Sequence, residues 1–170
     1  MSELFIVLLL IVPIAIGVLL VNSSHQKQKK KKQDAYIGYL NQVKNTTGVN
    51  PTYTKQLHTQ MLALDEVNRK LLVIDQHEGN YNYALFDLPT LKSYELKHVK
   101  ETVMLEGGKK SETFTSLVGV NLVPAGAERG KLIVFYDHQE HNVMAMQVIE
   151  KEALLFHNKI KALINNPVTI

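Results

Sequence analysis

The sequence predicts an α+β protein in which an N-terminal transmembrane helix precedes a small antiparallel, partly open β-barrel of about seven strands, capped by a C-terminal helix. Three observations lead to this fold class. Residues 4–21 form an uninterrupted apolar run, short apolar runs separated by turn residues follow from Gln56 onward, and the C-terminal part carries apolar residues at helical spacing. The 170 residues suffice for one compact domain behind an anchor.

The apolar run LFIVLLLIVPIAIGVLLV contains no charged side chain. As a helix it would be about 27 Å long, close to the roughly 30 Å hydrocarbon core of a bilayer. A cleaved signal peptide is the competing interpretation, but such peptides have a positively charged start and a small-residue cleavage site. The only charge before the run is Glu3, and no such site follows it. We therefore expect a single transmembrane anchor within residues 1–24.

A lysine cluster in the stretch QKQKKKKQ follows the apolar run. It consists of Lys27, Lys29, Lys30, Lys31 and Lys32. Because positive charges beside a span stay in the cytoplasm, the cluster predicts an inner-membrane protein with its N terminus outside and its C-terminal domain cytoplasmic. The same lysines are expected to contact anionic lipid, at about 1 kcal/mol each. Nucleic acid is not an expected partner, because the remaining chain has about as many acidic as basic residues.

Residues 25–55 are expected to form a basic juxtamembrane collar and a linker. A short helix is predicted over residues 34–44, where three apolar side chains share one face. These are Tyr36, Leu40 and Val43. Asn50-Pro51 indicates an extended connector. The folded domain is expected over residues 56–166, followed by a tail at residues 167–170.

The domain begins with short apolar runs that predict strands. The runs are HTQMLALDE, KLLVID, YNYALFDL, LPTLKSYELKHV, ETVMLE, TFTSLVGVNLV and KLIVFYD. HEGN predicts a tight turn, with Gly79 and Asn80 supplying the backbone freedom. PAGAERG predicts a hairpin loop, because the spacing of its glycines and the strand that follows do not fit a phosphate-binding loop.

The C-terminal part changes to helical periodicity from Asn142 to Ile164. Apolar residues at steps of three and four form one stripe. The stripe consists of Met146, Ile149, Ala153, Phe156, Ile160 and Leu163. Met144, Val148, Leu155 and Ile164 lie off the stripe, so we expect burial on more than one side of this helix.

The runs LALDEVNRKLLVID and YALFDLPTLKSYEL, with LIVFYD leading into an amphipathic helix, resemble bacterial pleckstrin-homology-like domains over residues 56–165. The resemblance implies a seven-stranded, partly open barrel that is capped by the helix and sits behind a membrane anchor. Phosphoinositide-binding members carry several basic residues around the first hairpin. This chain has only Arg69 and Lys70 there, beside Asp65 and Glu66, so specific headgroup binding by the domain is not expected.

The sequence contains no recognisable catalytic or cofactor motif. The densest group of potential metal ligands is DHQEH, in which His138 and His141 could share a helical turn. No third ligand follows at a recognisable spacing, so a polar loop is the favoured interpretation. The chain has no cysteine, and none of its serines stands in a nucleophile elbow. We therefore predict no catalytic, cofactor-binding or metal-binding residues.

The expected function is that of a non-enzymatic, single-pass, membrane-tethered cytoplasmic interaction module with a protein partner. The alternative is an accessory or assembly subunit of a membrane complex, which would associate through its span or its C-terminal helix. An enzyme with an unrecognised site is a third hypothesis, motivated only by His138 and His141.

Overall fold

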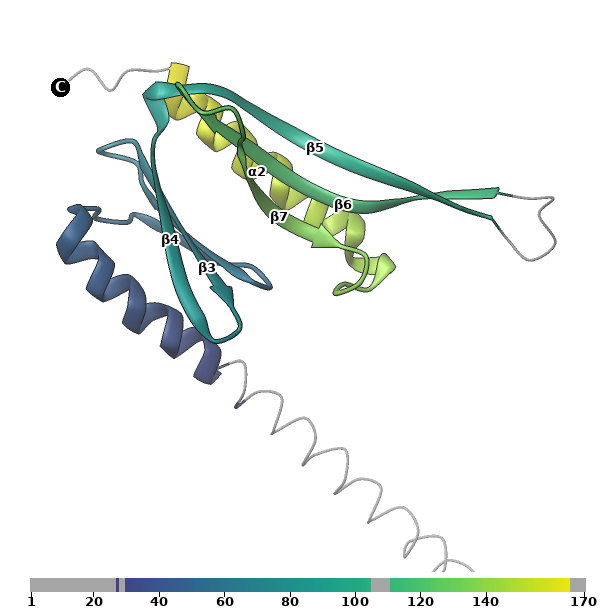
Figure 1. Cartoon of the computed structure of the whole chain (residues 1–170), viewed down its shortest axis with the longest axis horizontal. Coiled ribbons are helices and arrows are strands. Elements are labelled where there is room, and N and C mark those ends of the chain that lie inside the picture. Colours follow the sequence, from purple (N-terminus) through teal and green to yellow (C-terminus); the bar gives the residue numbers. More distant parts are fainter. Residues whose placement is uncertain (1–26, 28–29, 105–110, 166–170) are drawn as a thin grey trace, which may run out of the picture. The chain divides into compact units, whose positions relative to one another are not determined.

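A computed structural model describes residues 27, 30–104 and 111–165 of the chain (Figure 1). The described residues belong to two compact units that divide between Val43 and Lys44. A helix covers residues 30–47 and is longer than the predicted segment 34–44. It ends at Gly48, whose positive φ of 67° and N–H bond to the Lys44 carbonyl (2.9 Å) form a left-handed C-terminal cap.

The second unit begins with a four-stranded antiparallel sheet in the order β1-β2-β3-β4. The strands are β1 (Tyr53–Gln56), β2 (Gln60–Asp65), β3 (Lys70–His77) and β4 (Asn80–Asp87). A short 3-10 helix, η1 (Leu88–Thr90), leads to a second antiparallel sheet in the order β5-β6-β7. Its strands are β5 (Leu91–Met104), β6 (Ser111–Pro124) and β7 (Lys131–Asp137).

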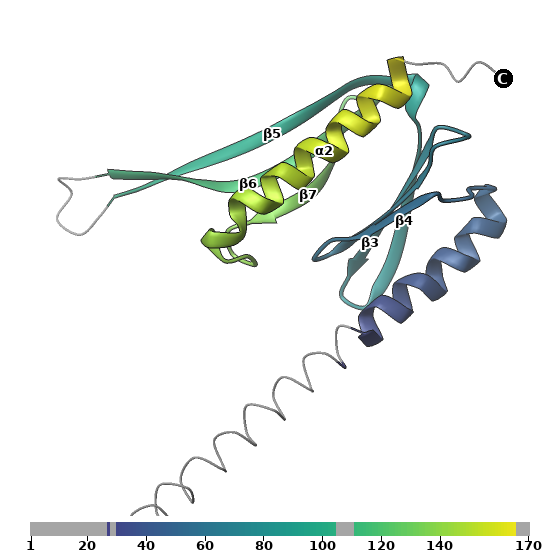
Figure 2. The same cartoon turned by 180° about the vertical axis from the view of Figure 1, so that it is seen from behind.

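The chain then passes through η2 (Val143–Ala145) into the long helix α2 (Met146–Asn165). The Asn142 side chain caps η2 by accepting a hydrogen bond from the Met144 N–H at 2.9 Å. Figure 2 shows α2 lying along the sheet formed by β5, β6 and β7. The predicted apolar stripe faces the core, where Ala153, Phe156 and Ile160 are buried.

The hydrophobic core combines side chains from both sheets with the stripe of α2. Leu62, Leu64 and Leu71 come from the first sheet, and Val120 and Ile133 come from the second.

The prediction that the C-terminal helix is buried on more than one side is wrong in part. Three off-stripe residues are exposed, one in η2 and two on the side of α2 that faces away from the core. They are Met144 (90% exposed), Val148 (63%) and Leu155 (69%).

The tight turn predicted at HEGN joins β3 to β4. Its two central residues, Glu78 (φ 50°) and Gly79 (φ 84°), both have positive φ. This is the backbone pattern of a two-residue hairpin whose twist matches that of the flanking strands. The sequence located the turn one residue too late, since Asn80 is the first residue of β4.

The predicted partly open barrel is wrong, because the seven strands form two separate sheets. The runs LPTLKSYELKHV and ETVMLE, expected as two strands, lie mostly in the single 14-residue strand β5. Its distal half pairs with β6 in a hairpin that projects from the domain and is exposed on both faces (Figures 1 and 2). β1 has only four residues and, among the described strands, pairs with β2 alone, so backbone hydrogen bonds between these strands do not close a barrel.

The structure also does not support the transmembrane helix of the predicted fold class, or the single-pass membrane description that rests on it. Across residues 27, 30–104 and 111–165, no helix has both the length and the apolar character needed to cross a bilayer. The predicted span at residues 4–21 lies outside the described residues, as do Lys29 and the tail at residues 167–170. The described fold is two antiparallel sheets with a long C-terminal helix, preceded by the helix of residues 30–47.

Candidate binding site between strand β1 and helix α2

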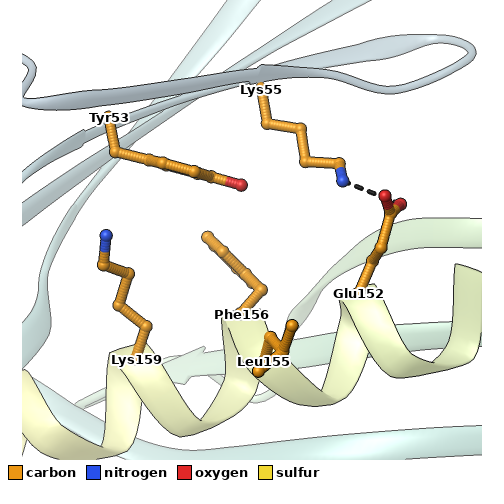
Figure 3. A pocket seen from close by; sticks show the side chains of 6 residues that line it. All are labelled: Tyr53, Lys55, Glu152, Leu155, Phe156 and Lys159. Atoms are coloured by element: carbon orange, nitrogen blue, oxygen red, sulfur yellow. Dashed lines mark ion pairs between the residues drawn. The ribbon is translucent and has the colours of Figure 1, made fainter.

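A pocket of about 550 Å³ lies between β1 and α2 (Figure 3). Strand β1 supplies two of its lining residues, and α2 supplies the other four. The lining consists of Tyr53, Lys55, Glu152, Leu155, Phe156 and Lys159. All six belong to the second compact unit.

Local periodicity explains why these side chains converge. Successive side chains of a strand point to opposite faces, so Tyr53 and Lys55 share the face of β1 that looks toward α2. Residues three, four and seven positions apart share one side of a helix, which groups the four α2 residues in the same way. The pocket therefore forms where one face of a strand meets one side of a helix.

Two ion pairs neutralise the lysines of the pocket. Lys55 Nζ lies 2.7 Å from Glu152 Oε2, and Lys159 Nζ lies 2.9 Å from Glu66 Oε1, in the turn after β2. All four side chains are partly exposed, so each pair adds little to stability. The hydrogen bond from Lys159 holds the pKa of the Glu66 carboxyl below its usual value; burial opposes this shift, and a bond from Thr52 supports it.

The floor of the pocket is aromatic and apolar. The Phe156 ring is buried and lies 5.5 Å, centroid to centroid, from the core ring of Phe135. Leu155 is 69% exposed at the pocket wall. The Lys159 ammonium lies 4.6 Å from the centroid of the Tyr53 ring, within the range of a cation–π contact. Such a lining is suited to holding an apolar side chain between two charges that are already paired.

The outer edge of β1 runs beside this pocket. The Leu57 N–H bonds the Gln60 carbonyl at 2.7 Å and closes the β1–β2 hairpin. Hydrogen-bonded pairs alternate along an antiparallel ladder, so Lys55 and Tyr53 bond to β2 while Thr54 and Gln56 direct their backbone groups outward. Within the described part of the chain, no strand pairs with this outer edge.

The described members of the lysine cluster, Lys27, Lys30, Lys31 and Lys32, are not among the residues that line the pocket. Lys27, Lys30 and Lys31 are exposed and Lys32 is half-buried, all in the first compact unit. The prediction that these lysines contact lipid and determine topology remains a prediction.

The histidines of DHQEH contact different neighbours. The His138 ring lies 4.6 Å from the Phe114 ring, and the His141 ring stacks on Tyr136 at 5.7 Å. Asp137 Oδ1 accepts the Gln139 N–H at 2.9 Å, as expected for a polar turn. Among the residues that the structure describes, no group of three histidine or carboxylate side chains could hold a metal ion.

The sequence predicted a linker for the first three residues of β1 and placed only Gln56 in the domain, and it did not indicate the pocket. The segment YTKQ has no aliphatic residue, so it lacks the apolar alternation that identifies a half-buried strand. The only local signal was the alternation of Tyr53 and Lys55 with Thr54 and Gln56. The ion pairs join residues about a hundred positions apart, a relation that one sequence does not encode in any local pattern.

Comparisons with known proteins found no match to any protein-family model, to any curated protein or to any solved structure. The resemblance to pleckstrin-homology-like domains therefore stays a prediction.

Proposed function

We propose that the chain is a non-enzymatic interaction module that binds a protein partner in the pocket between β1 and α2. The observation that carries this proposal is the composition of the pocket. An aromatic and apolar floor lies open beside Leu155, and the two lysines at its rim are already paired with carboxylates. Open apolar surface with a polar rim is the usual anatomy of a protein-binding site.

The chemistry of the lining favours binding over catalysis. Nucleophilic catalysis needs a nucleophile within hydrogen-bonding distance of a base. The six lining residues include no serine, cysteine or histidine. Both lysines are already engaged in ion pairs, at 2.7 and 2.9 Å.

A second candidate function is assembly through the solvent face of α2. Met144, Val148 and Leu155 follow at steps of four and seven, so they share one side of the helix region, and all are well exposed. Another helix could pack along them. Leu155 belongs to both surfaces, whereas Val148 does not line the pocket, and this difference separates the two candidates.

The predicted localisation at the inner membrane stays a prediction of residues 4–21 and the lysine cluster. The proposed interaction does not depend on it, because every residue of the pocket lies between Tyr53 and Lys159.

Photo-crosslinking in cells that express the full chain tests the proposal. A benzophenone amino acid is introduced at Leu155 in one variant and at Val148 in the matched control, since both positions are exposed on the same helix. We expect a discrete protein adduct from position 155 and none from position 148. The same adduct from both positions would favour assembly through the helix face, and no adduct from position 155 would refute binding at the pocket.

A further inference from the structure

We propose that the partner segment is an extended peptide, which adds to the outer edge of β1 as a further strand and places an apolar side chain in the pocket. This inference rests on the proposed function and specifies the chemistry of its ligand. It combines two independent features: the outward backbone groups of β1 and the pocket beside them.

The backbone of β1 specifies an extended ligand. Thr54 and Gln56 direct two N–H groups and two carbonyl groups away from β2, because the ladder bonds of Tyr53 and Lys55 occupy the inner side. An edge strand with unpaired backbone groups is a template for another strand. Only a peptide in the extended conformation can pair with both residues at once, as in other cases of strand addition.

The pleat of the added strand would direct its side chains. Residues that face each other across an antiparallel pair carry their side chains on the same face of the sheet. Peptide residues opposite Tyr53 and Lys55 would therefore point toward α2 and the pocket, as those two side chains do (Figure 3). The residue between them, paired with Thr54, would point away. Two positions separated by one residue should thus determine recognition.

The charges around the pocket favour an apolar side chain at these positions. An acidic ligand residue would have to compete with Glu152 or Glu66 for a lysine, and a basic one would have to displace Lys55 or Lys159. An apolar side chain disturbs neither ion pair and gains contact with the Phe156 ring and with Leu155.

The length of β1 favours a peptide over a second copy of this chain. Four residues extend about 14 Å. Pairing two such strands would bury far less than the roughly 1,200 Å² typical of stable complexes between folded proteins. A peptide needs only an edge and a pocket of this size.

The test uses a phage-displayed library of random nine-residue peptides, selected on the purified full-length chain. Affinities of selected peptides are then compared among four variants. Thr54→Pro removes the outward N–H and leaves the ladder bonds of Tyr53 and Lys55, as tolerated in edge strands. Thr54→Val is its matched control, because it keeps the N–H. Leu155→Glu alters the pocket, and Val148→Glu is the control on the same helix.

We expect selected peptides with apolar residues at two positions separated by one residue. Thr54→Pro and Leu155→Glu should each weaken binding at least about tenfold, the effect of losing one or two net contacts, while both controls bind as the natural chain does. N-methylation of the peptide backbone should weaken binding only at alternate residues, which keeps the test valid if Thr54→Pro fails to fold.

Three outcomes would overturn the inference. Peptides that depend on Leu155 but tolerate both Thr54→Pro and N-methylation would show a pocket ligand without strand addition, leaving the proposed function intact. Failure to select any peptide sensitive to Leu155→Glu would refute the proposed function as well. A dimer in sedimentation that dissociates in Thr54→Pro would identify a second copy as the occupant of the edge.

Discussion

Replacing Gln60 tests how the two sheets are held together. This side chain is buried, with 6% of its surface exposed, at the start of β2. Its Oε1 accepts the Val134 N–H at 2.9 Å, and its Nε2 donates to the Leu132 carbonyl at 3.2 Å and to Asp75 Oδ1 at 2.9 Å. The amide thus bonds two backbone groups of the edge strand β7 from the start of β2.

The structure sets the expected cost of Gln60→Ala. The variant loses three hydrogen bonds and leaves the Val134 N–H and the Leu132 carbonyl without this partner. At about 1 kcal/mol net for each bond, we expect the free energy of unfolding to fall by about 2–4 kcal/mol. Gln76→Ala is the matched control, because it removes the bond from the Gln76 side-chain amide to the Tyr81 hydroxyl at 3.1 Å, and we expect it to cost about 1 kcal/mol or less.

Urea denaturation of the purified chain, followed by circular dichroism, measures both changes. Unfolding midpoints should separate clearly while the slopes of the transitions stay equal, since both variants expose the same surface. If Gln60→Ala lost no more stability than Gln76→Ala, the hydrogen bonds of the Gln60 side chain would not help to hold the two sheets together.

Three further predictions concern the core, a close backbone approach and the response to acid. Ile160→Ala should lower the free energy of unfolding by about 2–4 kcal/mol in urea denaturation, because Ile160 is fully buried in the core; a loss below about 1 kcal/mol would contradict its placement there. Gly119→Ala should lower the melting temperature, since a Cβ would lie 2.6 Å from the Ile133 carbonyl oxygen, whereas Gly38→Ala, with open space at its Cβ, should keep or raise it; equal melting temperatures would refute the close approach. Burial raises the pKa of Asp65, but hydrogen bonds from Asn68 and Asn50 outweigh it and hold the pKa below its ordinary value. The stability that Asp65 contributes is therefore complete above its unfolded pKa of about 4 and is lost as the pH falls through the lowered folded value. Asp65→Asn should destabilise the chain at pH 7 and flatten the dependence of unfolding free energy on pH below 4, and an unchanged slope would rule out this role.

Local patterns predicted the segments of this fold better than their arrangement. The stripe from Met146 to Leu163 is a property of consecutive residues, and these residues do face the core. Whether the strands close into a barrel depends instead on contacts between distant segments. β1 has only four residues, and the Gln60 side chain bonds to β7 more than seventy positions away; neither feature follows from a periodic pattern.

The candidate site was harder to predict because its residues form no recognisable pattern in the local sequence. Lys159 and Glu152 look like ordinary solvent-exposed charges on an amphipathic helix. They belong to the site because they form ion pairs with Lys55 and Glu66, which lie about a hundred residues earlier in the chain. By contrast, the lysine cluster was predicted to be functional from its composition alone, and none of its described members lines the pocket.

Amide hydrogen exchange along β1, measured by NMR on the free chain, tests the central claim most directly. We expect the amides of Tyr53 and Lys55 to be protected by their bonds to β2, and those of Thr54 and Gln56 to exchange rapidly because they face outward. Protection of Thr54 and Gln56 to the level of Lys55 would mean that the edge is already paired, and would contradict an open site beside the pocket.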